Sequence, residues 1–101
     1  MSAPTGNWTI NANGFSGTMS TNVDVSGNVT GTMLGNTMVG FWDETSQRLI
    51  VYCEVLGTNL SGIQIYTGYR YGNNLAGSFE AFAGSGANAS RSVYGWHATQ
   101  P

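Results

Sequence analysis

The sequence predicts an all-β protein whose eight strands form an antiparallel up-and-down β-barrel. Short runs alternate apolar and polar residues, and no stretch has the spacing of an amphipathic helix. Both prolines, Pro4 and Pro101, lie at the ends, so proline does not interrupt hydrogen-bonded ladders between them. The connections are too short for crossover helices, which makes successive strands antiparallel neighbours. Eight strands are enough to close such a sheet, and an open sandwich of two sheets is the alternative.

The first half of the chain supplies four of these strands. The Asn13-Gly14 pair is the strongest hairpin signal and separates the first two strands. Ser26-Gly27 precedes the third strand, and Gly35-Asn36 is expected to turn the chain into the fourth. Strong alternation places Trp8 on an inward face, where it is expected to plug the barrel floor. The four strands are expected at residues 7–13, 15–20, 28–34 and 37–43.

The second half supplies four longer strands, expected at residues 48–56, 62–71, 74–82 and 90–99. Pairing the first two about the "TNLS" turn separates an apolar set from a mixed set. The apolar set is expected to face the interior, because burying the mixed set would desolvate charges. Its members are Leu49, Val51, Cys53, Val55, Ile63, Ile65, Thr67, Tyr69, Gly77, Phe79 and Ala81. In the competing register, Tyr66 and Glu80 point inward instead and form a polar-rimmed pocket.

Length and composition limit the classes of protein that the chain can be. Its 101 residues form a single domain, 1–101, in which 1–5 is expected to be a flexible tail. Three arginines, no lysine and a net charge of −2 make nucleic acid a poor partner. No apolar run has the length of a transmembrane helix, and a membrane barrel would place Glu54 and Glu80 against lipid. "MSAPTGNW" lacks signal-peptide features, so the chain as written is expected to be cytoplasmic, or secreted if a leader has been removed.

Few residues are suited to catalysis or metal binding. Cys53 is the only cysteine and lies in the apolar run "LIVYCEV", which predicts an inert buried thiol. His97 is the only histidine and is expected to be partly exposed on the last strand. Asp43 and Glu44 are adjacent but begin a hairpin connection, which is typical of solvated turn acids. We therefore expect no metal site and no cofactor.

Several segments resemble the avidin/streptavidin family of calycin-type barrels. These are "GNW" near the start, "SGNVTGTM", "VGFWD", "YTGYRYG" and the closing "AGSGANASRSVYGWHAT". The resemblance runs with short gaps from about residue 6 to residue 99 and lies in the order and spacing of the motifs. It implies a barrel that binds a small ligand at its open end and associates through the outer wall of its later strands.

The residues of the family's biotin pocket are largely not retained. Met33 stands where the family has a tyrosine, and only Tyr66 and Phe79 supply aromatic rings near its tryptophan positions. The closing strand, "YGWHA", has no carboxylate at the position of the pocket aspartate. The family's lid loop is replaced by the two residues Gly35-Asn36.

These observations predict a non-catalytic barrel that binds a small, largely apolar ligand and forms a homo-oligomer, a dimer or a tetramer. The expected ligand-binding residues are Met33, Trp42, Tyr66, Phe79 and Trp96. The expected interface residues are Tyr52, Arg70, Glu80 and Phe82. A lectin-like module that binds glycans is the first alternative. A cyclase or isomerase is the second, and it requires His97, Glu80 or Arg70 in the lumen.

Overall fold

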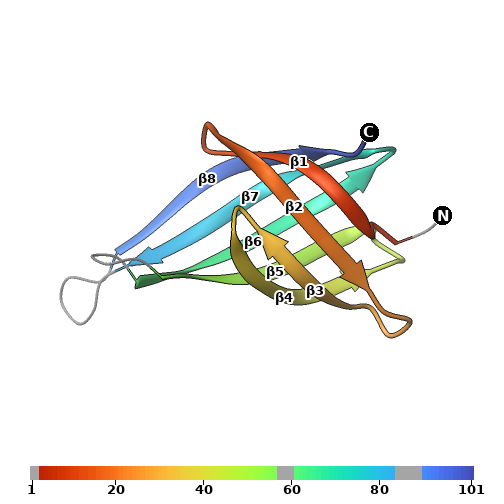
Figure 1. The fold of residues 1–101 in the computed structure, drawn as a ribbon. Helices are drawn as coiled ribbons and strands as arrows, with labels where there is room; N and C mark the ends of the chain where they lie inside the picture. Colours follow the sequence, from red (N-terminus) through yellow and green to blue (C-terminus); the bar gives the residue numbers. More distant parts are fainter. Residues whose placement is uncertain (1–2, 57–60, 84–89) are drawn as a thin grey trace.

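The structure, a computed structural model, describes residues 3–56, 61–83 and 90–101. Eight antiparallel strands follow one another around a closed barrel in sequence order (Figure 1), which confirms the predicted fold class and excludes the open sandwich. The strands are β1 (Gly6–Ala12), β2 (Phe15–Val23), β3 (Asn28–Met33), β4 (Asn36–Asp43), β5 (Arg48–Leu56), β6 (Ser61–Tyr71), β7 (Asn74–Ala83) and β8 (Ser90–Thr99). Within the described residues, no helix is long and apolar enough to cross a membrane.

Two tight turns at one end of the barrel have the same backbone conformation. Asn13 and Gly14 have φ angles of 49° and 85°, and Leu34 and Gly35 have φ angles of 50° and 84°. Positive φ at both central residues is the type I′ geometry, whose twist matches that of the flanking strands. The first turn confirms the Asn-Gly prediction. The second is centred on Leu34-Gly35, one residue before the expected Gly35-Asn36, so Asn36 already pairs with Met33.

The interior is a continuous apolar core contributed by every strand. Trp8, Ile10 and Ala12 share the inward face of β1, as alternation predicted, and Leu49, Val51 and Cys53 do so on β5. The other buried apolar side chains of the core are Met19, Val29, Met33, Met38, Trp42, Tyr66, Leu75, Phe79, Trp96 and Ala98. Burial of this apolar surface is the main favourable contribution to folding.

The register of β6 differs from the expected one by one residue. Val51 lies opposite Tyr66, and Tyr52 lies opposite Ile65. A one-residue slip exchanges the two faces of a strand, so Tyr66 is buried while Ile63 and Tyr69 are exposed. The prediction that Ile63, Ile65, Thr67 and Tyr69 face the interior was therefore wrong. The competing register was correct for Tyr66 but wrong for Glu80, and Val55 lies outside the described side chains.

The N-terminal end of the chain closes one end of the barrel. Pro4 is fully buried, and its carbonyl oxygen accepts hydrogen bonds from the Trp8 indole (3.2 Å) and from the Thr21 hydroxyl. Residues 3–5 therefore pack on the barrel and are not the flexible tail that we expected, while residues 1–2 lie outside the described residues. Trp8 lies at this floor, where the sequence predicted it.

A strand glycine, Gly68, makes room for the Trp96 indole. Gly68 and Gly77 lie opposite each other on β6 and β7, and Trp96 lies opposite Gly77 on β8. A Cβ atom at Gly68 would lie 2.5 Å from the indole and 2.9 Å from the Ala76 carbonyl oxygen. The indole nitrogen donates to the carbonyl oxygens of Thr67 (3.2 Å) and Ser78 (3.1 Å). Glycine is thus required where a wide side chain lies flat across the sheet.

We expect Gly68→Ala to lower the free energy of unfolding by roughly 2–3 kcal/mol, because the added methyl group overpacks against Trp96. Urea denaturation followed by tryptophan fluorescence measures this change. Gly95→Ala is the matched control: its Cβ would lie 3.9 Å from the nearest atom, the Gly77 carbonyl oxygen. The control should change stability by less than about 0.5 kcal/mol. Equal effects of the two substitutions would show that the contact with Trp96 is unimportant.

Candidate ligand-binding site

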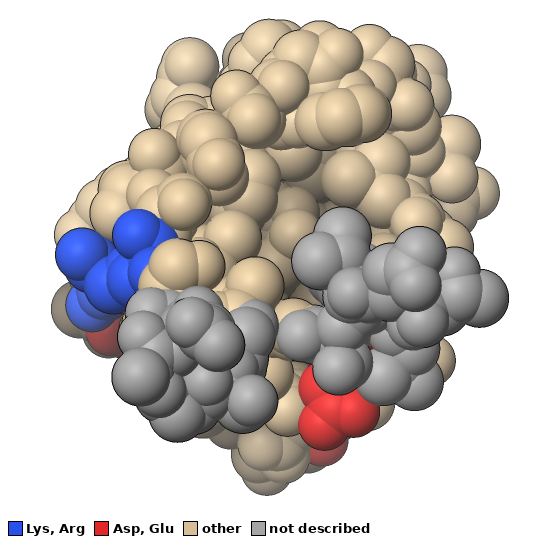
Figure 2. Space-filling view, turned by 90° about the vertical axis from the view of Figure 1, so that its left-hand side faces the viewer, with Lys and Arg blue, Asp and Glu red and all other residues tan. Residues whose placement is uncertain are grey.

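The barrel opens at the end opposite to the Pro4 floor. The β1–β2 and β3–β4 turns lie at this end, and β8 continues past the last residue that pairs with β1. Figure 2 shows this end face-on, with a recess among residues that are mostly neither acidic nor basic. We call this end the mouth.

A pocket of about 500 Å³ lies at the mouth. Eleven of the described residues line it: Ala12, Asn13, Phe15, Ser16, Leu34, Asn36, Gln64, Tyr66, Phe79, Ala81 and Tyr94. No acidic, basic or histidine side chain is among them. The volume falls within the range of small-molecule sites, which are typically apolar with a few fixed polar groups. An ionised ligand would lose hydration without gaining a charged partner from these residues.

Aromatic rings form one wall of the pocket. Tyr66, Phe79 and Tyr94 are neighbours across β6, β7 and β8. The rings of Tyr66 and Phe79 stack with centroids 4.5 Å apart and planes 15° apart, and those of Phe79 and Tyr94 are 5.3 Å apart. Trp96 contacts Tyr66 edge-on from below, at 5.7 Å and 76°. The stacking fixes these rings in place and leaves a rigid apolar surface for a ligand.

The polar groups of the pocket are uncharged and partly fixed by one another. The Tyr66 hydroxyl donates to Gln64 Oε1 at 2.9 Å, and the Asn36 amide donates to the Leu34 carbonyl oxygen at 3.4 Å. Desolvation, reinforced by the nearby Cys53, raises the pKa of the Tyr66 phenol, which keeps it protonated at neutral pH. The pocket therefore combines an aromatic wall with neutral hydrogen-bonding groups.

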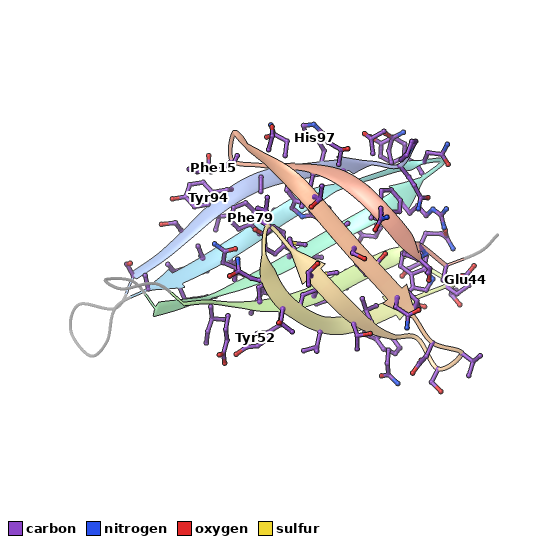
Figure 3. The ribbon with its side chains drawn as sticks, viewed as in Figure 1. Phe15, Glu44, Tyr52, Phe79, Tyr94 and His97 are labelled. Atoms are coloured by element: carbon purple, nitrogen blue, oxygen red, sulfur yellow. The ribbon has the colours of Figure 1, made fainter. Side chains whose placement is uncertain are left out.

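The five predicted ligand-binding residues do not form one site. Tyr66 and Phe79 line the pocket, and Trp96 lies beneath Tyr66. Met33 is buried in the core, next in sequence to the lining residue Leu34. Trp42 lies at the closed end, where its indole nitrogen donates to Glu44 Oε2 at 2.6 Å; Figure 3 shows Glu44 at the end opposite to Phe79.

Sequence reasoning missed Phe15 and Tyr94, which stand at the mouth in Figure 3. The turn signal and the alternation along the last strand could have identified both residues. Phe15 is the first residue after the Asn13-Gly14 turn, and Tyr94 precedes Trp96 by two positions on the same face of β8. Phe15 is 71% exposed and Tyr94 is 36% exposed. The rim of the mouth thus presents two accessible aromatic rings.

The expected interface residues lie mainly on the outer wall. Tyr52 and Glu80 both pair with Ile65, and Phe82 pairs with Ile63, so these three share the outward face of β5 to β7. Arg70 does not join them. Its backbone N–H donates to the Gln47 carbonyl oxygen and its Nε to that of Gly72, at the closed end.

The candidate acid–base residues do not face the pocket. His97 is exposed on the outer side of β8 (Figure 3), and Glu80 is paired with Arg91 on the outer wall. Asp43 accepts hydrogen bonds from the Thr45 N–H and the Ser46 hydroxyl, as expected for a turn acid. Within the described ranges, His, Cys, Asp and Glu side chains do not gather in a group of three or more that could hold a metal ion.

In comparisons with known proteins, the chain matches no family model, no curated protein and no solved structure. The structure itself establishes a closed eight-stranded antiparallel β-barrel with a mouth pocket whose described lining residues are uncharged. The avidin-like identity of this barrel stays a prediction.

The buried thiol leads to a pH prediction. Desolvation raises the pKa of Cys53 from an ordinary value of 9.0 to about 11. Between pH 9 and 11 the folded protein thus keeps a proton that the unfolded chain releases, so the free energy of unfolding should fall as pH rises. The slope from one group is at most about 1.4 kcal/mol per pH unit. Urea denaturation at several pH values measures it.

Cys53→Ala is the control for this pH dependence, since it removes the thiol but leaves Tyr66, whose raised pKa acts in the same direction. The variant should lose stability less steeply above pH 9. Identical slopes, or rapid modification of the native thiol by a disulfide reagent at pH 8, would contradict the expected burial effect.

Proposed function

We propose that the barrel binds a small, uncharged, largely apolar molecule at its mouth, without catalysis. The observation that carries this proposal is the composition of the pocket: its described lining residues include Phe15, Tyr66, Phe79 and Tyr94 and no charged side chain. A flat ring placed against Tyr94 and Phe79 would bury apolar surface and stack on a preformed wall. The Gln64 and Asn36 amides would then orient the ligand through hydrogen bonds.

The proposed site selects against charge because each lining polar group is neutral. Between two ligands of equal shape, an amide and a carboxylate, the carboxylate must be desolvated without a cationic partner. We therefore expect the neutral ligand to bind at least about tenfold more tightly. This selectivity distinguishes a specific pocket from a surface that adsorbs dyes.

Ligand binding is tested with the neutral dye Nile red and a panel of small aromatic amides, followed by dye and tryptophan fluorescence. Phe15→Ala and Tyr94→Ala should each weaken binding about 5- to 20-fold, since each removes an aromatic face. Phe41→Ala is the matched control, because Phe41 is also exposed (50%) but is absent from the mouth pocket. Fluorescence unchanged across the whole panel, or equal losses in all three variants, would count against the proposal.

A lectin-like function is the second candidate, and the rim of the mouth favours it. The exposed ring of Phe15 lies among Asn13, Ser16 and Asn36, and aromatic faces together with amides and hydroxyls can bind sugars. A glycan array separates the two proposals. Binding of a glycan that Phe15→Ala abolishes would favour the lectin, and an array without hits would remove it.

We also propose that copies of the chain self-associate through the outer wall. Apolar side chains stand exposed on this wall, where a soluble monomer usually has polar ones. Val39, Phe41, Ile50, Ile63 and Val93 are exposed there, and Tyr52, Ile65 and Phe82 are half-buried. Their positions across β4 to β8 make the surface continuous around that side of the barrel. A homo-oligomer that covers this wall would remove apolar surface from water.

We expect Ile50→Lys to abolish association through the wall, because Ile50 is 37% exposed on this wall, between Phe41 and Thr67. A buried lysine without a partner opposes association strongly. Sedimentation velocity over a range of protein concentrations measures the effect. Thr9→Lys, on the exposed face of β1, adds the same charge away from the wall and should leave association unchanged. Association equally strong in Ile50→Lys and the unmodified chain would exclude the wall.

A further inference from the structure

β8 has an edge beside the mouth that no described strand covers. β7 pairs with β8 along its whole length, from Thr99 to Ser90. β1 pairs with β8 only over residues 96–99. The remaining part of β8, residues 90–95, extends beyond the β1–β2 hairpin, as Figure 1 shows. We call the side of residues 91–95 that faces away from β7 the free edge.

The direction of the backbone groups on the free edge follows from one hydrogen bond. The Asn13 N–H donates to the Gly95 carbonyl oxygen at 3.1 Å, so the backbone groups of Gly95 point toward β1. Alternate residues of a strand point the same way. The N–H and C=O groups of Val93 and Arg91 therefore point outward from the free edge, and those of Ser92 and Tyr94 point toward β7. Among the described residues, no backbone group lies opposite Val93 or Arg91.

The free edge lacks most of the features that protect natural edges from pairing. Its register with β7 contains no bulge, and residues 90–95 contain no proline and no lysine. Its one charge, Arg91, is paired with Glu80 on the outer face at 2.5 Å. Val93 is β-branched and 52% exposed, which suits a strand that pairs with another. The edge is thus a regular, nearly neutral template for strand addition.

We propose that a second copy of this chain pairs with the free edge, β8 against β8, in an antiparallel register centred on Ser92. Arg91 then lies opposite Val93 of the second copy, and Val93 lies opposite its Arg91. Each such pair exchanges two hydrogen bonds, so about four join the two copies. The contact is isologous, so it closes as a dimer with a twofold axis and does not propagate.

The structure favours this register, with a second copy as the occupant, over the alternatives. A register centred on Val93 would place Arg91 opposite Gly95, whose carbonyl oxygen already accepts the Asn13 hydrogen bond. In the register centred on Ser92, the backbone groups of Arg91 in each copy bind those of Val93 in the other. The exposed Val93 and the half-buried Phe82 of each outer wall are also brought into one continuous surface. The pairing is short, so the dimer should be weak and form between about 10 μM and 1 mM.

This contact differs from the wall association and from ligand binding, and each can fail separately. Val93 and Arg91 do not line the pocket, so changes at the free edge should leave Nile red binding intact. Ile50, the test residue of the wall, lies on β5 and is not part of β8. Proline at Val93 is the sharpest probe, because it removes only an N–H that points away from β7.

The experiment starts from Ile50→Lys, which removes the wall association, and compares it with Ile50→Lys/Val93→Pro and Ile50→Lys/Val93→Ala by sedimentation velocity from 10 μM to 1 mM. We expect a reversible dimer, weakened at least about tenfold by Val93→Pro through its two lost hydrogen bonds. Val93→Ala keeps the N–H, so the Ile50→Lys/Val93→Ala dimer should lie within about threefold of the Ile50→Lys dimer. A monomer throughout this range, or a Val93→Pro dimer as strong as the original, would overturn the proposal.

Amide hydrogen exchange of the unmodified chain tests the same contact without a substitution. The Arg91 and Val93 amides should exchange rapidly at low concentration and become protected as the dimer forms. Ser92 and Tyr94 should be protected throughout by β7. If Arg91 and Val93 exchange at rates independent of concentration, the β8 pairing is excluded, even if Val93→Pro fails to fold.

Discussion

The rest of the structure depends on the closure of the sheet, which is made by the short ladder between β1 and β8. Only four residue pairs form it, from Thr9 with Thr99 to Ala12 with Trp96. Without this ladder the core side chains of all eight strands would lie on one face of an open sheet. Closure turns that face into an interior and removes most strand edges from solvent. Because the ladder is short, closure is complete at the Pro4 floor and incomplete at the mouth.

Closure also explains the glycines that recur in the strands. In a small barrel, wide aromatic side chains must fit against neighbouring strands without pushing those strands apart. Gly68 provides space for the Trp96 indole, and Gly77 lets β7 approach β6, since a Cβ atom there would collide with the Thr67 carbonyl oxygen. Trp96 then supports Tyr66, and Tyr66 stacks on Phe79. The aromatic wall of the mouth therefore depends on Gly68, a position that has no side chain.

The sequence predicted most of the fold, because the turn residues and the alternation in β1 and β5 agree with each other. Asn13-Gly14 fixed the first hairpin, and Trp8, Ile10 and Ala12 marked the interior. The register of β6 could not be found in the same way. Both faces of β6 carry apolar residues, Ile63 and Ile65 on one and Tyr66 on the other, so burial of apolar surface does not select a face. The choice depends on Tyr66 packing against Phe79 and Trp96, which are distant in sequence.

The candidate site was only partly predictable, for a related reason. Aromatic residues were expected in it, but the end of the barrel at which each one lies depends on the stagger of the strands, which alternation does not give. Trp42 and Phe79 both face inward, yet they lie at opposite ends. The uncharged lining could be recognised only after the β6 register brought Gln64 and Tyr66 into the lumen.

The mouth pocket and the free edge of β8 have one structural origin. β8 continues past the end of β1, so its inward residue Tyr94 borders the pocket, while no described residue pairs with the backbone of Val93 on the β1 side. A longer β1 would cover both, narrowing the mouth and pairing the edge. The short β1–β2 hairpin thus leaves an aromatic surface accessible to a ligand and, at the same rim, a backbone accessible to another strand. A hairpin that ends before its neighbouring strand leaves backbone groups of that strand unpaired.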